Sequence, residues 1–327
     1  MHTPPPLRIG LFGIGLDAYW PQFAGLKERL EGYVGRVAAK LARPGVEIVN
    51  LGLVDNPDRA YTAGHEFRRA DVDIIFLHVT TYALSSTVLP VVRRAHVPVI
   101  VLNLAPEPAL DYAAFNALGD RTKMTGEWLA HCSACPVPEI ANVFKRAGIT
   151  FHQITGVLDD DPACWREVDA WVEAARVAAA MNGNRLGLMG HTYGGMLDIQ
   201  SDATLQSVAF GTHIEHLEVD ELSALRREVT AKAVADRLRE FAEAFDVQAD
   251  CPEEDLREAA RTSVALDRLV AAHRLGSLAY FYKGTGVPEN EATIASIILG
   301  TSLLTARAVP VAGEYEVKNV QAMKIMD

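Results

Sequence analysis

Short apolar runs rich in β-branched residues alternate along the whole chain with longer amphipathic segments. Continuous apolar runs of this length are typical of strands that are buried on both faces of a parallel sheet. The pattern therefore predicts repeated βαβ units and a doubly wound α/β fold. Strands are expected at residues 7–13, 46–52, 73–79, 97–103, 150–157, 185–189, 213–218, 277–282 and 309–313.

The segments between these strands have the apolar spacing of helices, at residues 22–41, 58–70, 83–95, 138–147, 162–181, 231–245, 253–273 and 291–306. Asn182-Gly183-Asn184 is a helix C-cap and turn signal, and the strand and helix pattern restarts after it. The length of 327 residues exceeds the usual size of one domain. We therefore expect two Rossmann-like domains with parallel sheets, residues 1–183 and 184–327.

Charge and hydropathy narrow the classes of partner. A net charge of −11 without a basic stripe argues against nucleic acid. No apolar run has the length of a membrane span, and the N-terminus lacks the pattern of a signal peptide, so no membrane partner and a cytoplasmic location are expected. Residues 317–327 predict a helix without a C-cap glycine, a polar tail or a proline, so further protein is expected beyond Asp327.

The first strand opens into Gly13-Ile-Gly15-Leu-Asp-Ala18, which fits the G-x-G-x-x-[GA] dinucleotide fingerprint. That motif needs a helix that starts at its third small residue, whereas Pro21 marks a later helix start. The acidic residue expected at the end of the second strand is also displaced, to Asp55. Glycines that let a strand turn sharply are the simpler interpretation, and an NAD-dependent oxidoreductase stays an alternative.

Four cysteines, Cys132, Cys135, Cys164 and Cys251, do not make a disulfide framework in a chain this long, so reduced thiols are expected. Cys132-Ser-Ala-Cys135 resembles half of a zinc site or a redox pair. A structural zinc needs four ligands, and the chain has no second pair at the right spacing. We expect these two cysteines to serve in packing or in the wall of an active site, and to bind no structural zinc.

Two polar segments follow strands of the second domain, where ligands bind in doubly wound sheets. Gly190-His191-Thr-Tyr193-Gly-Gly follows the first strand, which makes His191 a candidate substrate-binding residue. Gly313-Glu314-Tyr-Glu316-Val-Lys318 follows the last strand. Carboxylates there suit a metal ligand or a general base, although a helix N-terminus also favours acidic residues through its dipole. Glu314 precedes the predicted helix, which favours the functional interpretation.

The segment Gly313-Glu314-Tyr315-Glu316-Val317-Lys318-Asn319 is similar to the G-E-G-D-W-K-T stretch of L-arabinose isomerases and their L-fucose isomerase relatives. The resemblance extends in outline over both domains. It implies that Glu314 is a Mn²⁺ ligand and an acid/base residue. It also implies a set of residues that contact the sugar: Tyr19, with Asp17 in place of the family's glutamine, Tyr82 after Leu77-His78, Tyr193 in place of a methionine, and Cys135 in place of a histidine.

The resemblance implies aldose–ketose isomerisation by proton transfer through a cis-enediol, with a divalent Mn²⁺ as Lewis acid. The family's remaining metal ligands, a glutamate and two histidines, lie beyond Asp327 in a β-rich domain, so we expect this chain alone to bind Mn²⁺ weakly or not at all and to be inactive. Family members form homo-oligomers with the active site at the subunit interface, so Tyr19 and Tyr82 are expected to act on the neighbour's site. A two-lobed sugar-binding protein without catalysis is the other alternative.

Overall fold

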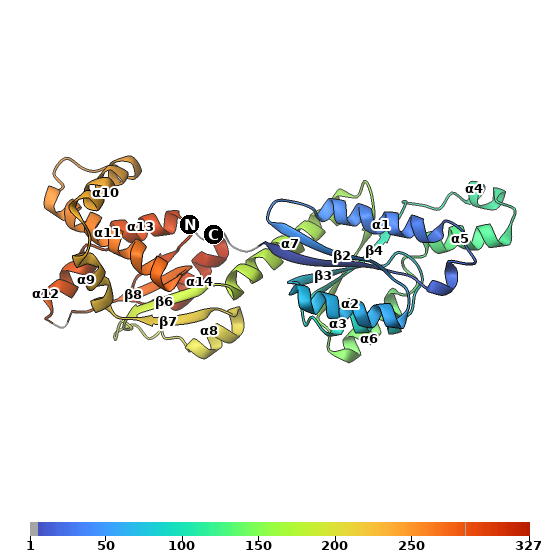
Figure 1. Cartoon of the computed structure of the whole chain (residues 1–327), viewed down its shortest axis with the longest axis horizontal. Helices are drawn as coiled ribbons and strands as arrows, with labels where there is room; N and C mark the ends of the chain where they lie inside the picture. Colours follow the sequence, from blue (N-terminus) through green and yellow to red (C-terminus); the bar gives the residue numbers. More distant parts are fainter. Residues whose placement is uncertain (1–5, 285) are drawn as a thin grey trace. The chain divides into compact units, whose positions relative to one another are not determined.

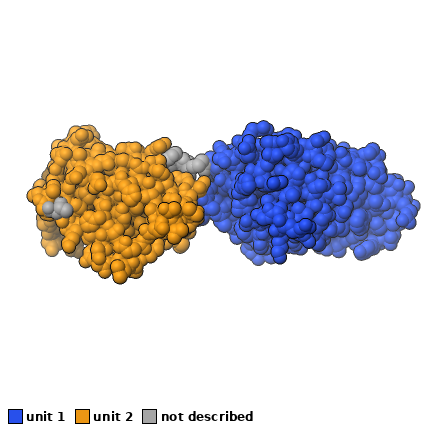
Figure 2. Space-filling view, turned by 90° about the horizontal axis from the view of Figure 1, so that it is seen from below, with its two compact units in different colours: residues 1–179 blue, residues 180–327 orange. Residues whose placement is uncertain are grey.

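The computed structural model describes residues 6–284 and 286–327. The chain divides into two compact units, unit 1 (residues 1–179) and unit 2 (residues 180–327), as Figure 2 shows. The division falls inside α7 (Pro162–Asn182), a helix of 21 residues. The sequence pattern instead gives a boundary at residue 183, because only the turn signal that ends this helix is visible in the sequence.

Five described strands of unit 1 form a parallel sheet in the order β2-β1-β3-β4-β5 (Figure 1). The strands are β1 (Leu7–Ile14), β2 (Val46–Val54), β3 (Ile74–His78), β4 (Val99–Ala105) and β5 (Phe151–Val157). The helices that connect them are α1 (Leu26–Leu41), α2 (Pro57–Ala70), α3 (Ser85–Arg93), α4 (Tyr112–Ala117), α5 (Arg121–His131) and α6 (Val137–Ala147), with a 3-10 turn, η1 (Asp17–Tyr19), before α1.

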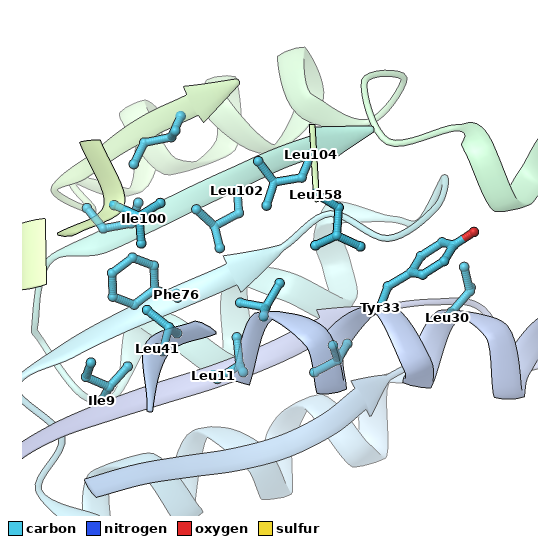
Figure 3. Close-up of a cluster of buried hydrophobic side chains, with 14 of the residues drawn as sticks. Ile9, Leu11, Leu30, Tyr33, Leu41, Phe76, Ile100, Leu102, Leu104 and Leu158 are labelled. Carbon is cyan, nitrogen blue, oxygen red and sulfur yellow. The ribbon is translucent and has the colours of Figure 1, made fainter. Parts of the chain in front are cut away.

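Alternate residues of each strand point to opposite faces of this sheet, and helices cover both faces, so both sets of side chains are buried. In β1, Ile9 and Leu11 join one core cluster (Figure 3). Helices α1, α5 and α7 also contribute buried residues to this cluster. Phe12 and Ile14 join the cluster on the other face, which α2, α3 and α6 cover. The continuous apolar strands of the sequence are therefore explained by burial on two sides.

Four described strands of unit 2 form a second parallel sheet, in the order β7-β6-β8-β9. They are β6 (Arg185–Gly190), β7 (His213–Leu217), β8 (Ser277–Phe281) and β9 (Val311–Ala312). The helices are α8 (Ala203–Phe210), α9 (Val219–Arg227), α10 (Ala231–Ala244), α11 (Glu253–His273), α12 (Pro288–Ala295), α13 (Ile298–Ala306) and α14 (Val317–Met326). A large apolar cluster fills the side of α9, α10, α11 and α13, and a smaller one lies between the sheet and α14.

The predicted α/β class with parallel sheets is confirmed, and a strand occurs at each predicted position. The helix expected at 291–306 is instead two helices, α12 and α13, which are separated at Ser296 and Ile297. Helices α4, α5, α8 and α9 were not predicted. Two of them, α4 and α8, have no buried residue, so they lack the apolar periodicity on which a helix prediction depends. None of the described helices combines the length and the hydropathy needed to cross a bilayer.

Candidate functional site

In unit 1 the strand order reverses between β1 and β3, and ligands of doubly wound sheets bind beyond the carboxyl ends of strands at such a point. The ends of these two strands are joined by a hydrogen bond from the Thr80 hydroxyl to the carbonyl oxygen of Ile14. Just beyond this bond, η1 carries Asp17 and Tyr19, and the loop after β3 carries Tyr82. The topology therefore brings three of the candidate residues to one edge of the sheet.

Trp20 occupies the space beside the glycine-rich turn. A Cβ atom added to Gly15 would lie 2.9 Å from the ring of Trp20, and the indole nitrogen of Trp20 donates a hydrogen bond to Asp55 (2.8 Å). A dinucleotide fingerprint uses this close approach for a pyrophosphate and starts a helix at its third small residue. Here α1 starts at Leu26 instead, so the local geometry is not that of a dinucleotide site.

Tyr19 and Tyr82 lie close together at this end of the sheet. Burial raises the pKa of Tyr19, and the neighbouring Tyr82 raises it further, so the Tyr19 hydroxyl stays protonated near neutral pH. Both rings pack against the same core cluster, and Tyr19 also contacts Phe23 edge to face at a centroid distance of 6.0 Å. A tyrosine hydroxyl can donate and accept hydrogen bonds. Asp17 is exposed beside them.

Cys135 is exposed at the start of α6, and its sulfur is bonded to that of Cys132, with the two Cα atoms 5.9 Å apart. The expectation of four reduced thiols is therefore wrong for this pair, while Cys164 and Cys251 are free. The correction has a physical reason. The turn between α5 and α6 brings the two Cα atoms within bonding range, and the spacing alone does not fix that turn.

A cleft of about 220 Å³ lies between α4, α5 and the loop after β4. The sequence pattern does not predict this cleft. Within it, the Glu127 carboxylate accepts a hydrogen bond from Arg29 (2.7 Å), which lowers the pKa of Glu127. His131 Nδ1 lies 2.9 Å from the carbonyl oxygen of Glu127. The cleft could not be predicted because the two helices that form it were not predicted. Its lining residues are Glu107, Leu110, Asp111, Ala114, Phe115, Leu118, Glu127 and His131.

His78, at the end of β3, is fully buried. Burial, with a smaller contribution from Arg36 and against the effect of the Leu104 backbone, lowers the pKa of His78 to about 3. The imidazole is therefore neutral at physiological pH, and it serves in the packing of the sheet edge rather than as an accessible proton donor.

In unit 2 the strand order reverses between β6 and β8, and His191 lies at this point. Its backbone N–H donates to the carbonyl oxygen of Phe281 (3.1 Å), and its Nε2 accepts from the backbone N–H of Lys283 (3.4 Å). Nδ1 lies 3.2 Å from the carbonyl oxygen of Thr192. With Nε2 accepting from Lys283, Nδ1 is the ring nitrogen that can donate to the Thr192 carbonyl oxygen. His191 is thus held in one orientation at the sheet edge.

Tyr193 packs on the same aromatic residue as His191. The ring centroids of Tyr193 and Phe281 are 4.9 Å apart, those of His191 and Phe281 are 5.3 Å apart, and Tyr193 is 40% exposed. The two candidate side chains are therefore brought together by Phe281, at the end of β8. An exposed aromatic face next to a hydrogen-bonding imidazole can contact the apolar and polar parts of a small polyol.

Glu314 is exposed directly after β9, as predicted for its position at the carboxyl end of that strand. Its φ is +54° and that of Tyr315 is +64°, a backbone region that is unfavourable for residues other than glycine. The turn is fixed by the Tyr315 N–H, which donates to the carbonyl oxygen of Tyr280 (3.0 Å). Burial raises the pKa of Tyr280, and the Glu314 carboxylate raises it further, so these two side chains lie near each other.

The loop that carries His191 and the turn that carries Glu314 are joined. Lys318, in the first turn of α14, donates a hydrogen bond from Nζ to the carbonyl oxygen of Asp198. One strand, β8, separates β6 from β9, so the two ends lie about 10 Å apart along the sheet. The edge of unit 2 therefore gathers an imidazole, an aromatic face and a carboxylate in a small region.

The resemblance implies a manganese site at Glu314, and the described residues can be searched for its ligands. Across residues 6–284 and 286–327, no three His, Cys, Asp or Glu side chains are grouped as metal ligands. Glu314 offers at most two oxygens, whereas a hard cation of this kind favours about six ligands. Any metal bound at Glu314 would need ligands from outside these residues.

No known protein-family profile matches the chain. Among solved structures, an ABC transporter solute-binding protein from Burkholderia multivorans shares 11% identity, covering 94% of this chain and 97% of that one, with a TM-score of 0.20. The D-lactate dehydrogenase of Escherichia coli shares 11% identity, covering 98% and 94%, also with a TM-score of 0.20. Likenesses this low carry no argument about function.

Among curated proteins, L-arabinose isomerase from Nocardioides sp. is 29% identical over 133 residues, which are 39% of this chain and 26% of that protein. The match thus spans about a quarter of the length of the isomerase. It supports a distant relationship between this chain and L-arabinose isomerase.

Proposed function

We propose that this chain supplies two α/β domains of an aldose–ketose isomerase of the L-arabinose isomerase type. The observation that carries the proposal is Glu314, an exposed carboxylate in a left-handed turn after β9, within a segment that resembles the isomerase G-E-G-D-W-K-T stretch. The distant sequence match to an L-arabinose isomerase also supports it.

In this proposal Glu314 is one of two carboxylates that move the proton. Together the pair removes a proton from the carbon next to the sugar carbonyl and returns a proton to the neighbouring carbon of the enediol. Its position in a turn held by the backbone of Tyr280 keeps the carboxylate at the strand end without burying it. The resemblance assigns a Mn²⁺ to the same residue, but since the described residues lack a ligand set, we derive no step through the metal.

The sugar-binding residues of the proposal fall into two groups, one on each unit. Tyr19, Tyr82 and Asp17 would donate or accept hydrogen bonds at the edge of unit 1, and His191 and Tyr193 would do so at the edge of unit 2. Cys135 is removed from this set because a disulfide sulfur has no S–H to donate. A homo-oligomer in which residues of one subunit complete the site of another also belongs to the proposal.

The test measures deuterium incorporation into the sugar in D₂O, using the full-length gene product that contains this sequence, with L-arabinose and L-fucose as substrates. Glu314→Gln keeps the shape but removes the charge and the basicity, so turnover should fall by on the order of 1,000-fold or more. Glu254→Gln, on the exposed first turn of α11, is the matched control and should keep full activity.

Both variants should keep the far-UV circular dichroism of the parent protein, because Glu254 and Glu314 are exposed. Near-normal turnover in Glu314→Gln would contradict the assigned role. Saturable sugar binding without any deuterium exchange in the parent protein would instead favour a sugar-binding protein without catalysis.

A further inference from the structure

The Cys132–Cys135 disulfide joins two residues that are three positions apart in the sequence. A ring this short removes little conformational entropy from the unfolded chain, so the bond adds less to global stability than a disulfide that closes a long loop. The bond instead links the ends of two helices. Cys132 is the C-cap of α5, and Cys135 directly precedes Pro136, which is the N-cap of α6.

The two sulfurs differ in access and in electrostatic surroundings. Cys132 is 5% exposed, whereas Cys135 is an exposed residue. Cys135 also lies near the N-terminus of α6, where the helix dipole favours a negative charge, while Cys132 ends α5, where the dipole opposes one. Because only Cys135 is exposed, access directs an external thiol to the Cys135 sulfur. The dipole acts on the free thiols, where it makes Cys135 the more reactive of the two.

The flanks of this bond hold the loop that carries Tyr82. On α5, the carbonyl oxygen of Leu129 accepts a hydrogen bond from the Thr81 hydroxyl (2.8 Å). On α6, the Glu139 carboxylate accepts from both the hydroxyl (2.6 Å) and the backbone N–H (3.0 Å) of Ser85. Tyr82 lies between these two attachments, so the separation of α5 from α6 affects where its ring can lie.

We propose that Cys132 and Cys135 form a reversible thiol–disulfide exchange site for low-molecular-weight thiols, and that its oxidised form clamps the loop of residues 79–84 around Tyr82. Neither half of the proposal depends on isomerase activity. It makes Tyr82 a residue whose position responds to the redox state of the pair.

The exchange takes place in two balanced steps. A thiolate of the small thiol attacks Sγ of Cys135, forming a mixed disulfide and breaking the bond to Cys132, which leaves as a thiolate and takes up a proton. A second small thiolate then attacks the outer sulfur, releasing the small disulfide and the Cys135 thiolate, which is also protonated. Two thiols are oxidised to one disulfide, and the protein disulfide gains two electrons and two protons.

The first experiment titrates the native chain with glutathione buffers of defined ratio, followed by acid quenching, alkylation and peptide mass spectrometry. The chain carries Cys251→Ser, which removes the exposed thiol outside the pair. Alkylation follows unfolding of the acid-quenched chain, so Cys164, a buried free thiol outside the pair, is the internal control for complete labelling. We expect Cys132 and Cys135 to gain two alkyl groups together at reducing ratios and none at oxidising ratios, with Cys164 alkylated at every ratio.

Two outcomes would overturn the exchange site. One is full alkylation of both cysteines in oxidised glutathione, which means that the bond does not form. The other is a bond that persists in reduced glutathione until the protein is unfolded. The single variants test the asymmetry: Cys132→Ser leaves the exposed Cys135, which should be alkylated at least about tenfold faster than the buried Cys132 left by Cys135→Ser.

The second experiment measures hydrogen exchange of the oxidised and reduced chain. Backbone amides of residues 79–85 should exchange about tenfold faster in the reduced form, because the clamp is released, while those of β1 and β2 should be unchanged. The double variant Cys132→Ser/Cys135→Ser should exchange like the reduced form in either buffer. Equal exchange of residues 79–85 in both redox states would refute the clamp even if the thiol exchange itself is observed.

Discussion

Gly190 offers a direct test of how the edge of unit 2 is held. It ends β6 with a φ of +85°, and a Cβ atom added to it would lie 2.0 Å from the carbonyl oxygen of Phe281. The same carbonyl oxygen accepts the hydrogen bond from the backbone N–H of His191. Gly190→Ala must therefore move the end of β8 away from β6, together with the residues that orient His191.

The expected loss of stability has three parts. The left-handed backbone costs a residue with a side chain about 1–2 kcal/mol, the lost hydrogen bond about 1 kcal/mol, and the forced displacement of packed backbone about 1–3 kcal/mol. The sum of about 3–6 kcal/mol is a large fraction of the roughly 5–15 kcal/mol that stabilises a typical domain. Gly286→Ala is the control, since Gly286 has a φ of +81° but nothing within 4 Å of the added Cβ atom. It should lose only the first part.

Urea unfolding can separate the two units, because the four tryptophans, Trp20, Trp128, Trp165 and Trp171, all precede residue 180. Tryptophan fluorescence therefore reports unit 1, while far-UV circular dichroism reports both units. Gly190→Ala should shift the dichroism transition to lower urea and leave the fluorescence transition in place. The reasoning fails if Gly190→Ala is no more destabilising than Gly286→Ala.

Two further predictions concern ion pairs of unit 2. The Glu221 carboxylate accepts a hydrogen bond from His273 (2.6 Å), and this bond, together with Glu215 and against the effect of burial, raises the pKa of His273. Because the pKa of His273 is higher in the folded than in the unfolded state, the ion pair contributes its full stability below the unfolded-state pKa near 6.5 and loses it as the pH rises through the folded-state pKa. The urea midpoint of unit 2 should therefore decrease when the pH is raised from about 6 to about 8.5. His273→Gln should remove this pH dependence. The buried Arg237 contacts Ser263, Asp267 and Glu240, so Arg237→Met should lower the unfolding free energy of unit 2 by about 3 kcal/mol. Arg239, which pairs with Asp236 on the surface, is the control, and Arg239→Met should change the unfolding free energy by less than about 0.5 kcal/mol. Equal losses in the two variants would refute the role of burial.

The sheets could be predicted from the sequence because strands buried on both faces leave continuous apolar runs, such as residues 97–103 for β4. The cleft beside α5 could not be predicted, because α4 has no buried residue and so no apolar periodicity. Its N-cap, Asp111, accepts hydrogen bonds from two backbone N–H groups, but an aspartate does the same in a simple turn. The pairing of Cys132 with Cys135 was missed for a related reason, because the turn that brings them together follows α5, which was also not predicted.

The sequence indicates that each candidate residue follows a strand, but it does not show which candidate residues lie next to each other. Tyr19 and Tyr82 are 63 positions apart, and the sequence shows only that each follows a strand. They become neighbours because β1 and β3 are adjacent in the sheet, which the apolar pattern does not specify. Glu314 and His191 likewise reach one edge only through the order β7-β6-β8-β9.

The glycines at the two strand ends explain why a glycine motif alone is weak evidence for a ligand. A glycine records that something approaches the backbone closely, but not what that group is. At Gly15 the approaching group is the ring of Trp20, and at Gly190 it is the carbonyl oxygen of Phe281. Both glycines therefore serve contacts within the chain, and the chemistry available to a ligand lies one to four residues further on, at Tyr19 and His191. The conservative substitutions Tyr19→Phe and His191→Gln should change ligand binding without changing the fold, whereas substitutions of the glycines should disturb the fold and, through it, the positions of these side chains.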